Sequence, residues 1–149
     1  MDRYAADGQI AIVTPAPGDT ALAVFASALT RAQIYQFILS ITGAGVADNV
    51  IEWLVRRLTA AGTSTAVPPA PLDFSAPPSQ LAAGENFTVE PTYTAPLLDP
   101  AVHQRSVYTW NAQPNGALKI PAVAGSGIGF TPIHAAYNQS ADVTAHWQE

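Results

Sequence analysis

The sequence predicts an all-β protein, an antiparallel β-sandwich of jelly-roll-like layout formed by one domain, residues 1–149. Short segments rich in β-branched and aromatic residues recur along the chain, and Gly, Pro and Asn turns separate them at spacings typical of a sandwich. Apolar residues make up 48% of the chain and charged residues only 11%, so a core is expected without disulfides. Five of the thirteen prolines lie between Pro68 and Pro78, which excludes a helix there.

The N-terminal third is expected to contain a loose arm and one long strand. The arm is residues 1–18, with a short edge strand at 10–13 and a proline-rich turn at its end. After an apolar segment at 21–28, residues 33–42 alternate as a strand. One face of that strand is predicted to carry Ile34, Gln36, Ile38 and Ser40, and the core face Tyr35, Phe37, Leu39 and Ile41.

Residues 49–60 fit two kinds of secondary structure. Apolar residues recur there at helical spacing, and Glu52 and Arg56 would form an i,i+4 pair on a helix. On a strand, Ile51, Trp53 and Val55 would share one face, and the neighbouring predicted strands with short glycine turns favour that arrangement. The periodicity favours a helix, and the context favours a strand.

Residues 86–147 are predicted to supply the remaining strands. Pro91 lacks the N–H that a sheet ladder needs, so the strand at 86–95 is expected at an edge or around a bulge. Turns at Gln113–Gly116 and Gly125–Gly127 separate the others. Those strands are predicted at residues 105–111, 117–123, 129–137 and 143–147.

Residues 63–82, which we call the strap, are apolar and proline-rich. A disordered linker is polar and charged, whereas the strap carries Asp73 as its single charge. Its larger apolar residues are Val67, Leu72, Phe74 and Leu81. An extended, irregular segment of this kind is suited to lie along a surface of this chain or of a neighbour. The strap therefore favours an assembly protein over an enzyme.

The charge distribution argues against several classes of partner. The net charge is −5, and the acids are spread singly along the chain. No Lys or Arg lies between Arg57 and Arg105, so nucleic-acid binding is not expected. The chain has no cysteine for a disulfide or a thiolate metal site. Residues 1–9 lack the features of a secretory signal, and no apolar run approaches the roughly 20 residues of a membrane helix, so a soluble protein made in the cytoplasm is expected.

No group of residues has the pattern of a catalytic or metal site. Gly125–Gly129 looks like a phosphate-binding loop, but it lacks the Lys-Ser/Thr of a P-loop and no helix pattern follows it. Ser126 does not complete a Gly-x-Ser-x-Gly pattern because residue 124 is alanine. No carboxylate stands at metal-ligand spacing beside the histidines, which are His103, His134 and His146. We therefore expect no enzyme activity, cofactor, metal or small-molecule substrate.

Aromatic residues on the predicted strands leave a second class of function open. Exposed Trp and Tyr rings can stack on sugars, and the candidate platform of such a glycan-binding module is Tyr108, Trp110 and Trp147. Aromatic residues on strands more often pack in a core or between subunits. Glycan binding is therefore the alternative to assembly.

The order of segments in residues 20–149 carries a resemblance. The similar segments are Gln33–Leu39, Val50–Arg57, the Pro-Pro-Ala-Pro-Leu of the strap, Tyr108–Pro114 and Gly127–Gly129. Together they resemble small all-β structural proteins of tailed bacteriophage virions, most of all those that decorate or cement the capsid. The resemblance implies an antiparallel sandwich without catalysis, and it favours a strand at 49–60.

The same resemblance implies a protein made in the host cytoplasm that ends on the capsid surface. Its implied partners are the major capsid protein and copies of itself, as a trimer. A place in the tail or neck of the virion is the nearest alternative. The residues expected to make contacts between subunits are Ile10 and Ile12 of the arm and Val67, Leu72 and Phe74 of the strap.

Overall fold

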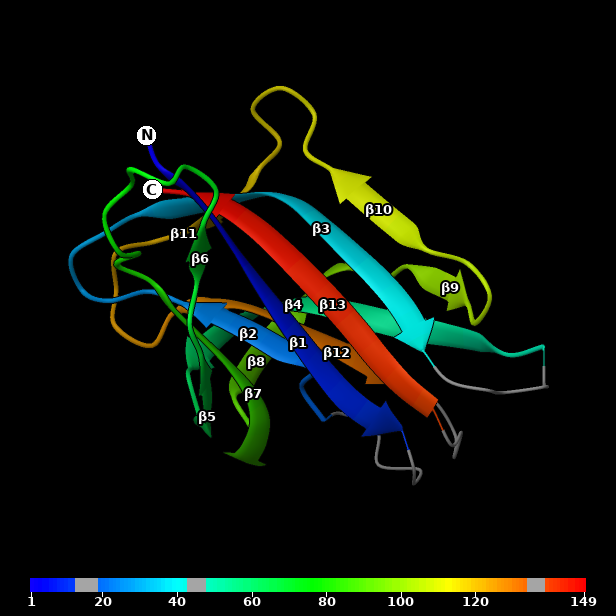
Figure 1. Cartoon of the computed structure of the whole chain (residues 1–149). Helices are drawn as coiled ribbons and strands as arrows, with labels where there is room; N and C mark the ends of the chain where they lie inside the picture. The colour runs from blue at the N-terminus through cyan, green and yellow to red at the C-terminus, as the bar shows by residue number, and fades with distance from the viewer. Residues whose placement is uncertain (13–18, 43–47, 134–138) are drawn as a thin grey trace.

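The computed structural model describes residues 1–12, 19–42, 48–133 and 139–149 (Figure 1). These residues form thirteen strands and no helix, which confirms the predicted all-β sandwich. The strands are β1 (Arg3–Ile12), β2 (Leu22–Phe25), β3 (Ala32–Thr42), β4 (Val50–Ala60), β5 (Thr63–Val67), β6 (Ala70–Pro71), β7 (Ala82–Val89), β8 (Thr92–Leu98), β9 (Ala101–His103), β10 (Tyr108–Asn111), β11 (Leu118–Ile120), β12 (Gly127–Ile133) and β13 (Gln139–Gln148).

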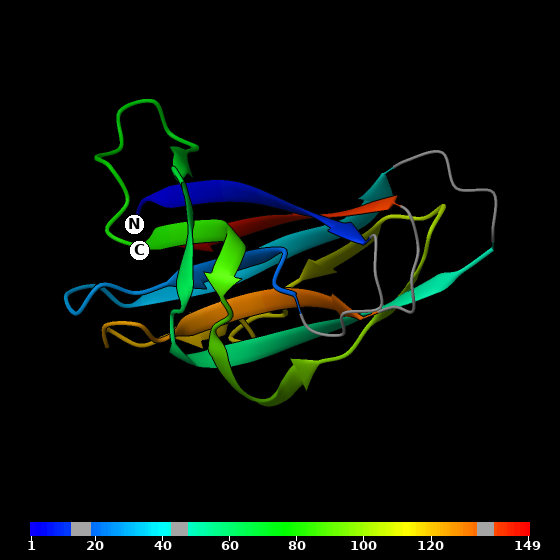
Figure 2. The same cartoon turned by 90° about the horizontal axis from the view of Figure 1, so that it is seen from below.

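Two antiparallel sheets pack face to face, and Figure 2 shows them as two layers. The first sheet has the order β10-β3-β13-β1-β6, with β11 also paired to β3. The second sheet has the order β5-β7-β2-β12-β4-β8, with β9 also paired to β4. Strands that are distant in sequence therefore lie side by side, as β1 and β13 do over ten paired residues.

The core lies between the two sheets and is built around aromatic side chains. Phe37 of β3 meets Phe130 of β12 edge to face, with ring centroids 5.2 Å apart, and so joins the two layers. Along β13, alternate residues are buried from Gln139 to Trp147, as a strand with one face on a core requires. The largest fully buried side chains are Trp53, Trp147, Tyr4, Phe37 and Phe130.

The predicted faces of β3 are correct for only part of the strand. Phe37 and Leu39 are fully buried as expected, but Ile34 is buried as well and Tyr35 is not. The pairing with β13 shifts between His146 and Trp147, so Tyr35 is an extra residue on its strand. A bulge of this kind reverses the alternation on one side of itself, which exchanges the places of Ile34 and Tyr35.

The N-terminal arm is ordered over most of its length. Residues 3–12 form β1, which pairs with β13 along its whole length and with β6 at Tyr4 and Ala5. The loose arm was therefore a wrong prediction for these residues, and the turn predicted at its end falls at residues 13–18, outside the described residues.

Residues 50–60 form the strand β4, with Ile51, Trp53 and Val55 buried on one face.

The strap joins the two sheets instead of lying on one of them. Its first part, β5, pairs with β7 of the second sheet, and β6 pairs with β1 of the first. Figure 2 shows this connection crossing one side of the sandwich. The prediction of an irregular strap is wrong for β5, which contains no proline, and for the two-residue β6, which lies at a sheet edge where proline is tolerated.

The C-terminal half contains the predicted strands with shifted limits. The segment predicted at 86–95 is divided into β7 and β8 by residues 90 and 91, where Pro91 interrupts the ladder. The short strand β9 was not predicted, because its three residues are too few to show a period. The strand predicted at 129–137 is β12, and residues 134–137 lie outside the described part of the chain.

Candidate functional site

The return of the strap is fixed to both ends of the chain. The buried hydroxyl of Tyr4 donates to the Pro77 carbonyl oxygen at 2.8 Å, and the Leu72 N–H donates to the Arg3 carbonyl oxygen at 2.8 Å. The carboxylate of Glu149 accepts hydrogen bonds from the Ser79 hydroxyl, from the Gln80 N–H at 2.9 Å and from the Leu81 N–H at 3.3 Å. Residues 72–81 are therefore held in place by main-chain and side-chain bonds at each end.

The tip of the strap is a tight turn organised by Asp73. Its carboxylate accepts hydrogen bonds from the Ser75 N–H at 2.9 Å and the Ser75 hydroxyl at 2.8 Å, and its carbonyl oxygen accepts from the Ala76 N–H at 3.0 Å. The main-chain and hydroxyl bonds from Ser75 lower the pKa of Asp73. Prolines before and after the turn further restrict the backbone. The turn is thus pre-organised without help from a partner.

This turn presents two apolar side chains to solvent. Phe74 is 105% exposed and Leu72 is 52% exposed, so neither is used in the core of the subunit. Beside them lies a hollow of about 270 Å³ lined by Met1, Asp2, Arg3, Leu72 and Asp73. Exposed apolar side chains on a turn are more typical of a protein-binding surface than of an enzyme site.

Two loops that contain other exposed apolar residues lie at the same end of the sandwich. The loop at residues 26–31, which contains Leu29, and the loop at 121–126, which contains Val123, occupy this end in both views (Figures 1 and 2). The two loops are joined by the bond from the Ala26 N–H to the Ser126 carbonyl oxygen at 2.8 Å. We call the exposed apolar side chains of the strap turn and of the N-terminus beside it the strap-end surface, which consists of Met1, Leu72 and Phe74.

The structure separates the residues predicted to make subunit contacts. Leu72 and Phe74 lie together on the exposed turn. Ile10 and Val67 are partly buried and pack against the core of their own subunit, so only a fraction of each is available to a partner. Ile12 ends β1, and its side chain lies outside the described part of the structure.

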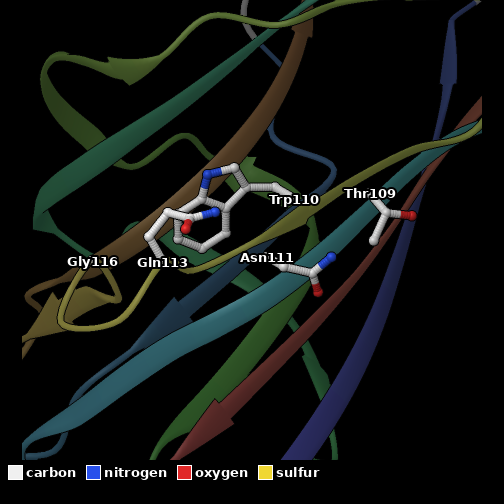
Figure 3. A pocket seen from close by; sticks show the side chains of 5 residues that line it. All are labelled: Thr109, Trp110, Asn111, Gln113 and Gly116. Atoms are coloured by element: carbon white, nitrogen blue, oxygen red, sulfur yellow. The ribbon is translucent and has the colours of Figure 1, made fainter.

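The predicted glycan platform does not exist as a group. Trp147 is fully buried and its indole N–H donates to the Glu149 carboxylate at 3.1 Å, so it offers no face to a sugar. Tyr108 is half-buried beside Phe37, with ring centroids 6.3 Å apart. Trp110 differs from both, because it borders a hollow that is open to solvent (Figure 3).

The histidines and the glycine loop do not form a reactive site in the described residues. His103 lies in β9 of the second sheet, 3.9 Å from Asp48, whereas His146 lies in β13 of the first sheet. His134 falls outside the described residues, and within them no three potential metal ligands gather. The Ser126 hydroxyl donates to the Val123 and Pro121 carbonyl oxygens at 2.6 and 3.1 Å, which is the geometry of a structural turn.

Sequence reasoning missed a polar cluster that ties β8 to its sheet. The Tyr93 ring lies under the Arg56 guanidinium at 3.9 Å, and burial raises the pKa of its hydroxyl. The Thr20 hydroxyl bonds the Tyr93 hydroxyl and donates to Glu90 at 2.6 Å, while Arg56 donates to Thr131 at 2.9 Å. Gly129 was the signal in the sequence, since its missing side chain makes room for the Tyr93 ring. The cluster holds β8 in its sheet, and its residues line neither the hollow at Leu72 nor the one at Trp110.

Comparison of the chain with family models, with curated proteins and with solved structures gives no match. Within the described residues, no helix is long and apolar enough to cross a membrane. Function must therefore be argued from the strap and from the hollows of the surface.

Proposed function

We propose that this protein is a structural protein of a bacteriophage virion, a capsid decoration protein that stabilises the head through contacts with the major capsid protein and with its own copies. The observation that carries the proposal is Phe74, which is fully exposed on a turn that the subunit holds rigid. The resemblance of the segment order to phage decoration proteins supplies the identity of the assembly.

Rigid presentation is what distinguishes Phe74 from an ordinary exposed apolar residue. Single apolar residues are common on protein surfaces. Here, however, the backbone of the turn is fixed by Asp73, by the bond from Tyr4 to Pro77 and by Glu149, so the main chain that carries Phe74 has little conformational freedom left to lose. A loop that is already ordered binds with a smaller entropy cost than a flexible one. The strap-end surface therefore has the properties of a docking surface.

The energy available from such a surface suits a protein that binds in many copies. Burying Phe74 and Leu72 fully would contribute about 1.5 to 3 kcal/mol each. That gain is modest for one subunit, but on a shell it is repeated at every site and strengthened where linked copies bind together. The few charges of the chain also limit the desolvation cost of covering its surface.

The direct test is the location of the protein in purified phage particles. We expect mass spectrometry to find it in intact particles, and electron microscopy of particles with and without its gene to place the lost density on the head. Absence of the protein from particles contradicts the proposal. Density on the tail or neck alone would replace decoration with a tail function.

A binding experiment tests the strap-end surface itself. Particles that lack the protein are incubated with the parent and with Phe74→Asp, Leu72→Asp and Val107→Asp. Val107 is the matched control, because it is 65% exposed but lies between β9 and β10, away from the strap. We expect the two strap variants to bind at least about tenfold more weakly, as the loss of one buried apolar side chain predicts. Parental binding by both variants would exclude the strap from the contact.

A further inference from the structure

A second hollow lies along the open edge of β10, at the opposite edge of the first sheet from the strap strand β6. It measures about 450 Å³, which is within the range of small-ligand sites. Figure 3 shows Trp110 and Gln113 on one side of the strand and Thr109 and Asn111 on the other. None of the five lining residues, Thr109, Trp110, Asn111, Gln113 and Gly116, carries a charge.

The wall of this hollow is a tryptophan ring with a fixed position. One face of the Trp110 indole stacks on Phe37, with centroids 5.0 Å apart and an angle of 15° between the rings. Phe37 is fully buried, so the indole rests on the core and cannot turn freely. Gln113 lines the same hollow as the indole (Figure 3). Its loop is closed by the bond from the Gly116 N–H to the Gln113 carbonyl oxygen at 2.7 Å.

The open edge of β10 and the strand face opposite Trp110 carry hydrogen-bonding groups. The Ala112 N–H bonds the Tyr35 carbonyl oxygen at 2.8 Å, and main-chain groups alternate along a strand, so those of Thr109 and Asn111 point away from β3 to the open edge. The side-chain oxygen of Asn111 accepts from Gln36 at 2.9 Å. That bond fixes the Asn111 amide and leaves its NH₂ group for a ligand. The hollow thus offers fixed donors and acceptors without charge.

We propose that this hollow binds a neutral saccharide. The apolar C–H face of a sugar ring would contact the Trp110 indole, and its hydroxyl groups would bond the amides of Asn111 and Gln113 and the free main-chain groups of β10. Uncharged lining favours a neutral ligand over an acidic one. Only two residues of β10 direct main-chain groups outward, which is too few for an added peptide strand. The site does not depend on the strap or on the virion.

Tryptophan fluorescence provides the test on the intact protein. Trp53 and Trp147 are fully buried, so Trp110 is the tryptophan that a bound sugar would contact. The probes are glucose, galactose, mannose, N-acetylglucosamine, their disaccharides and, as the charged contrast, sialic acid. We expect saturable changes in emission for at least one neutral sugar with a Kd of about 1 mM, which is typical for a ligand of roughly a dozen heavy atoms.

Variants separate this site from non-specific effects. Gln113 is exposed, so the Gln113→Ala variant should fold normally. We expect this variant to bind the sugar about fivefold more weakly through the loss of one hydrogen bond. Trp110→Ala should abolish saturable binding measured by calorimetry, and Gln80→Ala, an exposed glutamine at the strap, is the matched control. The proposal is overturned if no neutral sugar binds at tens of millimolar, if Gln113→Ala binds like the parent, or if extended peptides bind at β10 while sugars do not.

Discussion

Tyr4 and Pro77, which are 73 residues apart, are joined by a hydrogen bond of 2.8 Å from the tyrosine hydroxyl to the proline carbonyl oxygen. The Tyr4 ring is buried and stacks on Trp147 at 6.1 Å, so the bond connects the core directly to the return of the strap. Because the pyrrolidine nitrogen of Pro77 has no N–H, its carbonyl is the only main-chain group through which this residue can be held. The position of the Phe74 turn is therefore set by the first strand of the sandwich.

Removing the Tyr4 hydroxyl should loosen the strap without emptying the core. Tyr4→Phe keeps the ring, so we expect the free energy of unfolding to fall by only about 1 kcal/mol, the usual value of one hydrogen bond. Hydrogen exchange should become faster at the Leu72 and Ala76 amides, which donate within the strap contacts. The control is Tyr35→Phe, on the outer face of β3. Unchanged exchange in Tyr4→Phe would show that Glu149 and Arg3 hold the strap alone.

The fold class was predictable because alternation and turn residues are local signals. The bulge at Tyr35 was not, since it depends on the pairing of β3 with His146 and Trp147 more than 100 residues later. The same holds for β1, which reads as an arm in isolation and becomes a central strand only between β13 and β6. A local sequence pattern shows the hydrophobic period of a strand, whereas the pairing register of that strand is set by partner strands distant in sequence.

The candidate sites were predictable to different degrees. Val67, Leu72 and Phe74 were predicted together because apolar residues among prolines are not expected to be buried in a helix or strand, yet Val67 lies in β5 and is partly buried. Trp110 could be singled out only as an aromatic residue, because Trp147 looks the same in sequence and lies in the core. Gln113 was recognised as part of a turn, but its place in the same hollow as Trp110 follows from the folded path of the loop after β10.

Gly129 should be intolerant of a side chain because the Tyr93 ring occupies that space. A Cβ on Gly129 would lie 2.5 Å from the Tyr93 hydroxyl oxygen and 2.7 Å from a ring carbon. Tyr93 cannot move away easily, since Arg56 covers its ring and Thr20 bonds its hydroxyl. We expect Gly129→Ala to lower the unfolding free energy by about 1 to 3 kcal/mol in urea titrations.

A double-mutant cycle identifies the cause of that loss. In a Tyr93→Ala background the space above Gly129 is empty, so Gly129→Ala should cost much less there than in the parent. Equal costs in both backgrounds would show that the glycine is needed for its backbone and not for the Tyr93 ring.

His146 should make the protein less stable in mild acid. Burial lowers the pKa of its imidazole, and the Asp7 carboxylate opposes part of that shift. The Nδ1 atom of His146 lies 2.6 Å from Gln36 Oε1. The centroids of the Tyr35 ring and the His146 imidazole are 6.1 Å apart. In the unfolded chain His146 takes up a proton near about pH 6.5, whereas in the folded chain it does not. The stability that its neutral imidazole contributes is therefore present above about pH 6.5 and is lost as the pH falls through the folded pKa.

Two measurements check the acid effect. NMR titration should give a pKa for the His146 ring below the ordinary value, and the fall in the urea midpoint between about pH 7.5 and 5.5 should be smaller in His146→Gln than in the parent. Because the other histidines are unchanged in that variant, they cancel in the comparison. A His146 pKa at or above about 6.5 would contradict the assigned effect of burial.

We expect the apolar side chains that the subunit leaves uncovered on the strap to be covered in a homo-oligomer. Leu72 and Phe74 are exposed on the hydrogen-bonded turn of the strap, and the subunit does not use them in its own core. A closed assembly of copies would cover these apolar side chains, so we expect a homo-oligomer, and the resemblance to decoration proteins implies a trimer before a dimer. In that oligomer Leu72 and Phe74 would pack against the neighbouring chain.

Light scattering on the isolated protein at tens of micromolar measures this directly. We expect the mass of three chains of 15.6 kDa for the parent and of one chain for Leu72→Asp and Phe74→Asp, since a buried carboxylate without a partner opposes association. Val107→Asp should stay a trimer. If the parent is a monomer that still binds particles, the shell provides the neighbouring surface for Phe74. If the two strap variants remain trimers, the contact between copies lies elsewhere on the sandwich, because a charge at a packed Phe74 would separate the chains.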